Sequence, residues 1–101
     1  MKIVNLTPHT VNVGDQTFPA SGQLARCEET WEQVDIVKGI TFLMNFKYGE
    51  TNLPEEQSDT YLIVSLPVAL AEPNRNDLLI AVGQIRNEAG QIIGAKGLAR
   101  L

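Results

Sequence analysis

The sequence contains one histidine and one cysteine, and both are candidates for chemistry. His9 follows Thr7-Pro8 and needs an orienting carboxylate and a nucleophile to act as a general base, or further ligands to hold a metal. Its neighbours in the sequence supply neither, so the alternative is that Thr7-Pro8-His9 forms a turn whose polar side chains bind nearby backbone groups. The single cysteine, Cys27, excludes an internal disulfide and a zinc site built on paired cysteines. Its position in an alternating strand is typical of a small buried hydrophobic residue.

At Ser65-Leu66-Pro67-Val68 a predicted strand ends and a predicted helix begins. The Ser65 hydroxyl can accept a hydrogen bond from the Val68 amide, and the remaining free amides and the positive end of the helix dipole favour an anion. The simpler interpretation is a helix cap alone, because no glycine-rich phosphate loop accompanies this segment.

Polar groups are concentrated in the segment Asn74-Arg75-Asn76-Asp77. Arg75 can bind a phosphate or carboxylate through two parallel hydrogen bonds while Asp77 orients its guanidinium. Alternatively, the two side chains form a local pair that stabilises a turn. The first hypothesis predicts that Arg75→Ala weakens ligand binding without affecting folding, and the second predicts a loss of stability.

Charge is distributed unevenly along the 101 residues, which carry 8 Lys and Arg, 12 Asp and Glu and a net charge of −4. Residues 28–59 contain eight acids and two lysines, whereas the segment from Asn74 onward contains four cations and two acids. Duplex DNA requires a basic stripe, so no nucleic acid partner is expected. We interpret the acidic half as a solvated face with a loop, the alternative being an acidic surface that binds protein.

Short β-branched runs separated by Gly, Pro, Asn and Asp predict a fold of many strands. The predicted strands are Lys2–Leu6, Val11–Val13, Gln16–Phe18, Gly22–Glu28, Gln33–Val37, Ile40–Phe46, Thr60–Ser65, Leu78–Val82, Gln84–Arg86, Gln91–Ala95 and Gly97–Leu101. Of these, Thr60–Ser65 is expected at the centre of the sheet, and Ile40–Phe46 is apolar enough to cross the core. Pro67–Glu72 is the one predicted helix, since Pro is tolerated in a first turn, and residues 49–59 are predicted as a loop.

The fold class is therefore α+β and mainly β: a compact antiparallel or mixed sheet of short strands with one short helix, in a single domain of residues 1–101. A chain of this size buries only about 60 to 65% of its unfolded surface, so a site must lie on loops, an edge or a subunit interface. We expect a homo-oligomer, because pairing enlarges a small core or a cavity.

No apolar run approaches the roughly 20 residues of a membrane helix. The opening Met-Lys-Ile-Val-Asn is also too short and polar for a signal peptide. We therefore expect a cytoplasmic protein without a membrane partner.

Several segments, spread over nearly the whole chain, together carry a family likeness. They are Asn5-Leu6-Thr7-Pro8-His9, Pro19-Ala20-Ser21-Gly22, Ala25-Arg26, Tyr61-Leu62-Ile63-Val64-Ser65, Arg75-Asn76-Asp77 and Gly90-Gln91-Ile92-Ile93-Gly94. The chain resembles small phage, prophage and bacterial proteins that begin with an N-L-T-P-H segment. This resemblance implies a phage accessory role and supplies no catalytic residue. One departure is Ala95-Lys96-Gly97, where such relatives are expected to carry Arg after the strand and Cys near the glycine.

These observations favour a phage-type accessory protein that binds a small anionic ligand or nucleotide without catalysis, cofactor or metal. Such a protein can sequester a host immune signal in the host cytoplasm. The expected ligand contacts are His9, Arg26, Ser65, Arg75 and Asp77. Two alternatives stay open: a protein-binding module that inhibits a host protein through the acidic middle of the chain, and a nucleotide-degrading enzyme that uses His9.

Overall fold

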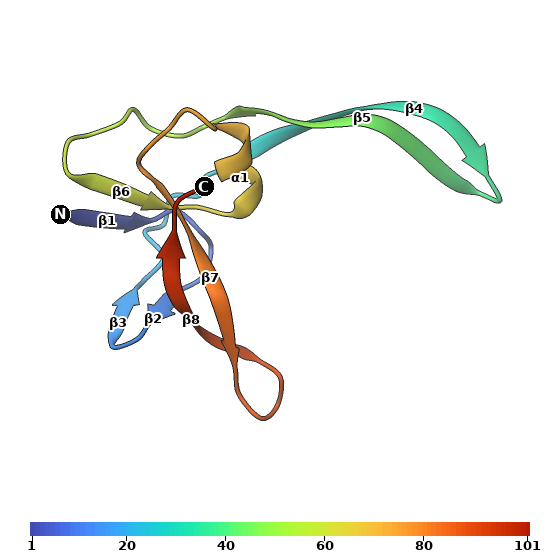
Figure 1. Ribbon diagram of the computed structural model, residues 1–101. Helices are drawn as coiled ribbons and strands as arrows, with labels where there is room; N and C mark the ends of the chain where they lie inside the picture. Colours follow the sequence, from blue (N-terminus) through green and yellow to red (C-terminus); the bar gives the residue numbers. More distant parts are fainter.

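Eight strands and one helix make up the computed structural model, which describes residues 1–101. The elements are β1 (Lys2–Asn5), β2 (Val11–Val13), β3 (Gln16–Phe18), β4 (Cys27–Val37), β5 (Ile40–Thr51), β6 (Thr60–Ile63), α1 (Leu66–Ala71), β7 (Leu78–Arg86) and β8 (Ile92–Ala99). Six strands form one sheet in the order β1-β6-β7-β8-β2-β3, while β4 and β5 pair only with each other (Figure 1). The predicted α+β, mainly β class with one short helix is confirmed.

The six-stranded sheet is mixed. Strands β1, β6 and β7 run parallel, and α1 forms the crossover from β6 to β7. The antiparallel hairpin β7–β8 follows, and β8 then pairs in parallel with β2 of the β2–β3 hairpin. An isolated bridge from Asn5 to Ala20 joins the β1 edge to the chain just after β3, so the sheet curls towards closure.

The hydrophobic core is small and lies where α1 packs on the parallel part of the sheet. Its buried cluster consists of Leu6, Leu62, Val64, Val68, Ala69 and Leu78. Strand β6 lies between β1 and β7, and Ile63 within it is fully buried. The segment predicted as a central strand, Thr60–Ser65, is thus an interior strand over Thr60–Ile63, but it is second in the sheet rather than at its middle. The helix begins one residue earlier than predicted, with Pro67 in its first turn. At six residues it is too short to cross a membrane.

Residues 27–51, which we call the arm, form a long hairpin that projects away from the sheet (Figure 1). Its turn, Lys38-Gly39, has φ of 52° and 77°, the positive values that a tight type I′ hairpin turn requires. The arm makes the molecule extended, with a radius of gyration of 16.4 Å. A compact chain of this length is expected near 13 Å.

Three sequence predictions in this region were wrong. Ile40–Phe46 does not cross the core but lies in the arm, where Phe42 and Leu43 are each 47% exposed. An apolar run indicates that the side chains of a strand are stabilised by burial. It does not indicate whether residues of the same chain bury them. Gly22–Glu28 is irregular up to Cys27, because Asn52 binds the Leu24 carbonyl and the Arg26 amide through its side chain. The predicted 49–59 loop is irregular only from residue 52, since β5 extends to Thr51.

Candidate functional site

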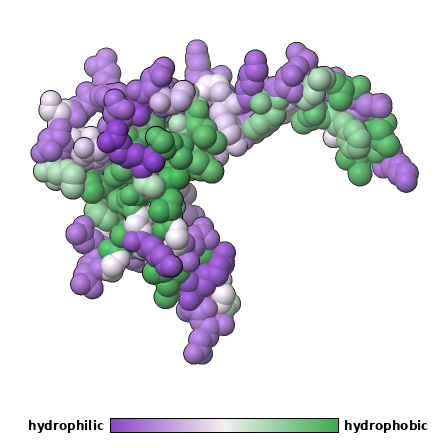
Figure 2. Space-filling view, in the orientation of Figure 1, coloured by the Kyte–Doolittle hydropathy of each residue, from purple (hydrophilic) through white to green (hydrophobic).

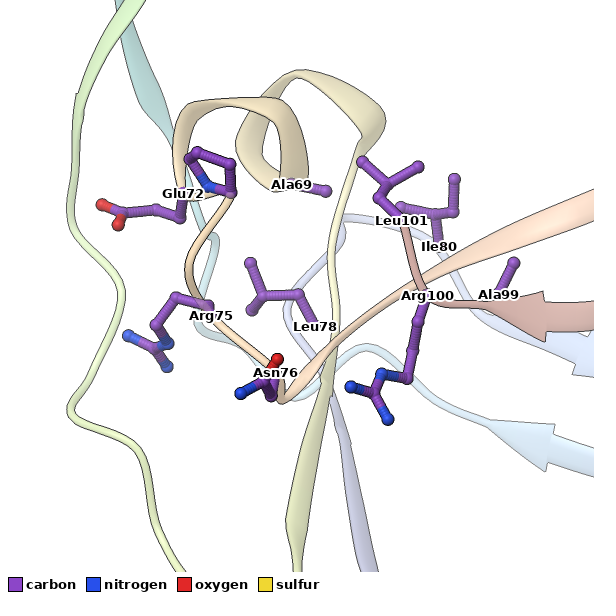
Figure 3. Close-up of a pocket in the computed structure, with 10 residues that line it drawn as sticks. Ala69, Glu72, Arg75, Asn76, Leu78, Ile80, Ala99, Arg100 and Leu101 are labelled. Carbon is purple, nitrogen blue, oxygen red and sulfur yellow. The ribbon is translucent and has the colours of Figure 1, made fainter.

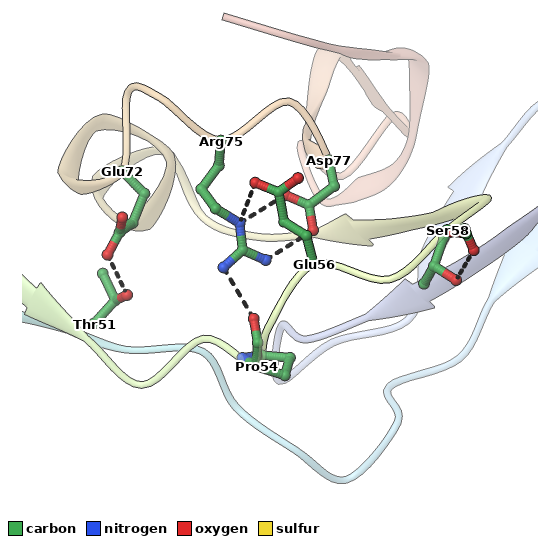
Figure 4. Close-up of polar contacts among 8 residues, drawn as sticks. Thr51, Pro54, Glu56, Ser58, Glu72, Arg75 and Asp77 are labelled. Atoms are coloured by element: carbon green, nitrogen blue, oxygen red, sulfur yellow. Dashed lines mark hydrogen bonds and ion pairs between the residues drawn. The ribbon is translucent and has the colours of Figure 1, made fainter.

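Arg75 and Asp77 are the only two of the five predicted contacts that the structure brings together (Figure 4). Arg75 Nε donates to Asp77 Oδ1 at 2.8 Å, and its Nη2 donates to Asp77 Oδ2 at 2.7 Å. Its Nη1 donates to the Pro54 carbonyl at 2.9 Å, and Glu56 Oε1 lies 3.4 Å from Nε. The guanidinium thus joins the 52–59 loop to the start of β7.

The electrostatics of this pair are those of an internal ion pair. The two side chains are 15% and 9% exposed. The hydrogen bond from Arg75 lowers the pKa of Asp77, and the same bond raises the pKa of Arg75, while burial opposes both shifts. Because Asp77, Glu56 and Pro54 already occupy the guanidinium, this geometry favours the local-pair interpretation.

Ser65 occupies the N-cap position of α1, but its hydroxyl makes no capping hydrogen bond. Only its carbonyl takes part in the helix, accepting from the Ala69 amide at 3.1 Å. The prediction that its side chain caps Val68 was therefore wrong. Strands β6 and β7 are parallel neighbours. Ser65 follows the C-terminal end of β6 and Arg75 precedes the N-terminal end of β7, so the two residues lie at opposite ends of this strand pair. The structure thus does not build the anion site predicted to join them.

His9 lies in a turn organised by Asn5, whose side chain is buried. Asn5 Nδ2 donates to the carbonyls of His9 and Phe18 at 2.7 and 2.8 Å, and Oδ1 accepts from the Thr7 amide and hydroxyl. The Thr7 hydroxyl also donates to the His9 carbonyl. The turn interpretation of residues 7–9 is confirmed, and the His9 side chain is exposed. Sequence reasoning missed Asn5, although the Asn-x-Thr spacing of an Asx turn signals it.

Arg26 directly precedes the arm, and its side chain makes no hydrogen bond or ion pair with the other four residues. It lines an open groove together with the carboxylates of Glu28 and Glu50, which disfavour an anion there. Cys27, in the same groove, is half-buried and packs against the core, in line with its prediction as a small hydrophobic residue.

A pocket that the sequence did not predict lies between β2, β7 and β8 and has a volume of about 170 Å³. Its wall is apolar and consists of Val11, Ala81, Ile92, Ile93 and Ala95. Thr10, Asn12 and Gln84 add hydroxyl and amide groups. Apolar walls with a few polar groups are the usual composition of small-molecule sites.

Arg86 does not itself line this pocket, but its side chain is hydrogen-bonded to Gln84, which does. Its Nη2 donates to Gln84 Oε1 at 3.3 Å and its Nη1 to the Gly90 carbonyl at 2.7 Å. No carboxylate lies within ion-pair distance of Arg86, unlike Arg75. Its charge is therefore not neutralised by a neighbouring carboxylate. The site joins parts of the chain about 80 residues apart, as in the hydrogen bond from Asn12 to the Ile93 carbonyl.

A second pocket, shown in Figure 3, lies between the end of α1, the 75–76 loop and the C-terminal residues. Arg75 and Arg100 both line it, but in the figure their guanidinium groups do not converge. Its volume of about 50 Å³ is less than a third of that of the first pocket. Of these two pockets, the one between β2, β7 and β8 is the larger, and no charged side chain lines it.

No protein family model matches the sequence, and comparison with curated proteins and with solved structures also gives no match. No group of three or more His, Cys, Asp and Glu side chains is arranged to hold a metal ion.

Proposed function

We propose that this chain is a non-enzymatic, phage-type accessory protein that binds a small anionic ligand, such as a nucleotide, in the pocket between β2, β7 and β8. The observation that carries the proposal is the apolar wall of this pocket beside Arg86, a cation without a carboxylate partner. Sequestration of a host immune signal in the host cytoplasm is the role such a protein can serve, because removing a signal requires affinity and no chemistry.

Each part of the pocket has a separate task in this proposal. The apolar side chains take up a flat ring such as a nucleobase, and the Asn12 and Gln84 side chains contact its polar edge. Arg86 binds a phosphate through charge-assisted hydrogen bonds. Of the contacts predicted from sequence, His9 directly precedes the pocket residue Thr10. Arg75 and Asp77 have a structural role instead.

Titration calorimetry with AMP, ADP, a cyclic dinucleotide and inorganic phosphate tests the proposal. We expect at least one nucleotide to bind, and Arg86→Ala to weaken that binding about tenfold or more, since a charge-assisted hydrogen bond contributes about 1.5 to 3 kcal/mol. Ala81→Phe should abolish binding by filling the pocket. Lys96→Ala is the matched control, because it removes a cation of β8 whose side chain, unlike that of Arg86, makes no hydrogen bond to a pocket residue.

Two results would contradict this function. If no nucleotide binds, or if both pocket variants bind like the wild type, the pocket is not the site. If the nucleotide is recovered in cleaved form and His9→Ala prevents the cleavage, the protein is instead the nucleotide-degrading enzyme considered above. Mass spectrometry of the recovered ligand distinguishes binding from cleavage.

The arm favours a second candidate function, a protein-binding module that inhibits a host protein. It is acidic and carries large exposed apolar side chains. Capture from host lysate by the immobilised chain, compared with capture by a Phe42→Lys variant, tests this candidate. A host protein retained only by the wild type supports it.

A further inference from the structure

The outer half of the arm exposes apolar side chains on both of its faces. Alternation along the strands places Ile40 and Phe42 on one face and Leu43 on the other. The large exposed apolar residues of the arm are Trp31, Val34, Ile36, Val37, Ile40, Phe42, Leu43, Met44 and Phe46, at 39 to 60% exposure. A two-stranded hairpin gains little stability in water by itself, so a partner that covers these side chains would stabilise the arm.

A second unpartnered apolar surface, spread over both faces of the strands because Ile92 and Ile93 are consecutive residues of β8, lies on the β7–β8 hairpin. Val82, Ile85, Ile92 and Ile93 are 37 to 53% exposed there. The arm and this hairpin project from the body in different directions (Figure 1), and Figure 2 shows apolar surface on both projections. The two surfaces therefore cannot cover each other within one chain.

The two surfaces also have opposite charge. The outer half of the arm, residues 31–46, carries Glu32 and Asp35 against Lys38, while the other acids of the arm lie nearer its base. Residues 78–99 carry Arg86 and Lys96 against Glu88. Opposite charge favours contact between the arm of one copy and the hairpin of another. Contact between two arms is disfavoured, since like-charged surfaces repel.

We propose that the arm of one copy of this chain packs on the β7–β8 hairpin of a second copy. Each chain would then contribute exposed apolar side chains from two places, nine on the arm and four on the hairpin. A two-fold axis forms the contact twice, so that one face of each arm is covered. Ile92 and Ile93 also line the ligand pocket, so the partner's arm lies beside it. The interface does not depend on ligand binding.

Light scattering on the ligand-free full chain at micromolar concentration tests the assembly. The wild type should be a dimer, and Phe42→Lys and Ile85→Lys should each be monomers with circular dichroism spectra like that of the wild type. Leu101→Lys, which changes a 71% exposed apolar residue outside both surfaces, should remain a dimer. A monomeric wild type would overturn the proposal. If that monomer also retains a host protein, and Phe42→Lys does not, the arm binds the host protein instead of a second copy.

Disulfide cross-linking identifies the contact without placing a charge in an apolar surface. In a Cys27→Ser background, Phe42→Cys chains and Ile85→Cys chains are oxidised separately and then as a mixture. A covalent dimer only in the mixture supports arm-on-hairpin contact. If Phe42→Cys chains link to each other and the mixture adds nothing, the arms pack together and the proposed contact is wrong.

Discussion

At the scale of single residues, Arg75 is used to hold the fold together. Its guanidinium bonds to Asp77 and to the Pro54 carbonyl, and this fixes the 52–59 loop against the start of β7. A buried ion pair contributes little net stability compared with apolar residues, but removing one partner leaves the other charged and poorly solvated. A residue type suited to binding phosphate therefore serves a structural role here.

Arg75→Ala should lower the free energy of unfolding by about 3 kcal/mol, the lower end of the range for breaking a buried pair, because the side chains keep some exposure. Urea denaturation of the variant measures this loss. Arg100→Ala, which removes a cation that makes no ion pair, should remain close to the wild type. Unchanged stability together with weaker anion binding would support the ligand-contact hypothesis for Arg75 instead.

The same pair should make stability sensitive to acid. Asp77 has a lowered pKa in the folded protein, so the folded state binds its proton less readily than the unfolded state does. Its contribution is complete above the ordinary Asp pKa of about 3.9 and is lost as the pH falls through the lower, folded-state value. The difference in unfolding free energy between wild type and Asp77→Asn should therefore be large at pH 7 and smaller at pH 3. An equal difference at both pH values would show that Asp77 is not the linked group.

At the scale of elements, the β7–β8 hairpin depends on one glycine. Gly83 has a φ of 69°, and a Cβ added to it would lie 2.8 Å from the Lys96 Cβ on the neighbouring strand. The left-handed conformation costs a non-glycine residue about 1 to 2 kcal/mol, before any clash is counted. The two strands predicted from sequence, Leu78–Val82 and Gln84–Arg86, form the single strand β7, which continues through Gly83 in its left-handed conformation.

Gly83→Ala should destabilise the protein by about 2 kcal/mol or more. Gly97→Ala is the matched control, because Gly97 lies in the paired strand and a Cβ there meets nothing within 4 Å. We expect Gly97→Ala to change stability by less than about 0.5 kcal/mol. Thermal unfolding of the two variants makes the comparison, and equal melting temperatures would refute the role given to Gly83.

Local sequence patterns predicted the elements better than they predicted the arrangement. The β-branched run at 60–65 and Pro67 are local signals, and both β6 and α1 were found with small shifts. The apolar run at 40–46 was correctly assigned to a strand and wrongly to the core, because periodicity shows that a residue needs cover without identifying what covers it. The pocket beside Arg86 was missed because the pairing of β2 with β8 has no signal in the sequence near either strand.

At the scale of the whole molecule, the chain consists of a small packed body and a long uncovered arm. Only 10 of the 101 residues are buried, and all of the fully buried core cluster belongs to the body. From the arm, only Cys27, at its base, packs against that cluster. The stability of a single chain should therefore come mainly from the body.

Shortening the arm tests this division. Thr30 and Lys47 pair directly, so residues 31–46 can be replaced by Asn-Gly, which favours a two-residue hairpin turn. The reference is the Phe42→Lys chain, because an assembled wild type gains apparent stability from association. The shortened chain should unfold cooperatively, within about 1 kcal/mol of that reference, since the removed side chains contribute little to the core. Its radius of gyration by X-ray scattering should fall from 16.4 Å to about 12 to 13 Å, the value of a compact chain. A non-cooperative transition would show instead that the arm belongs to the folding unit, and that its apolar side chains stabilise each chain before any partner is bound.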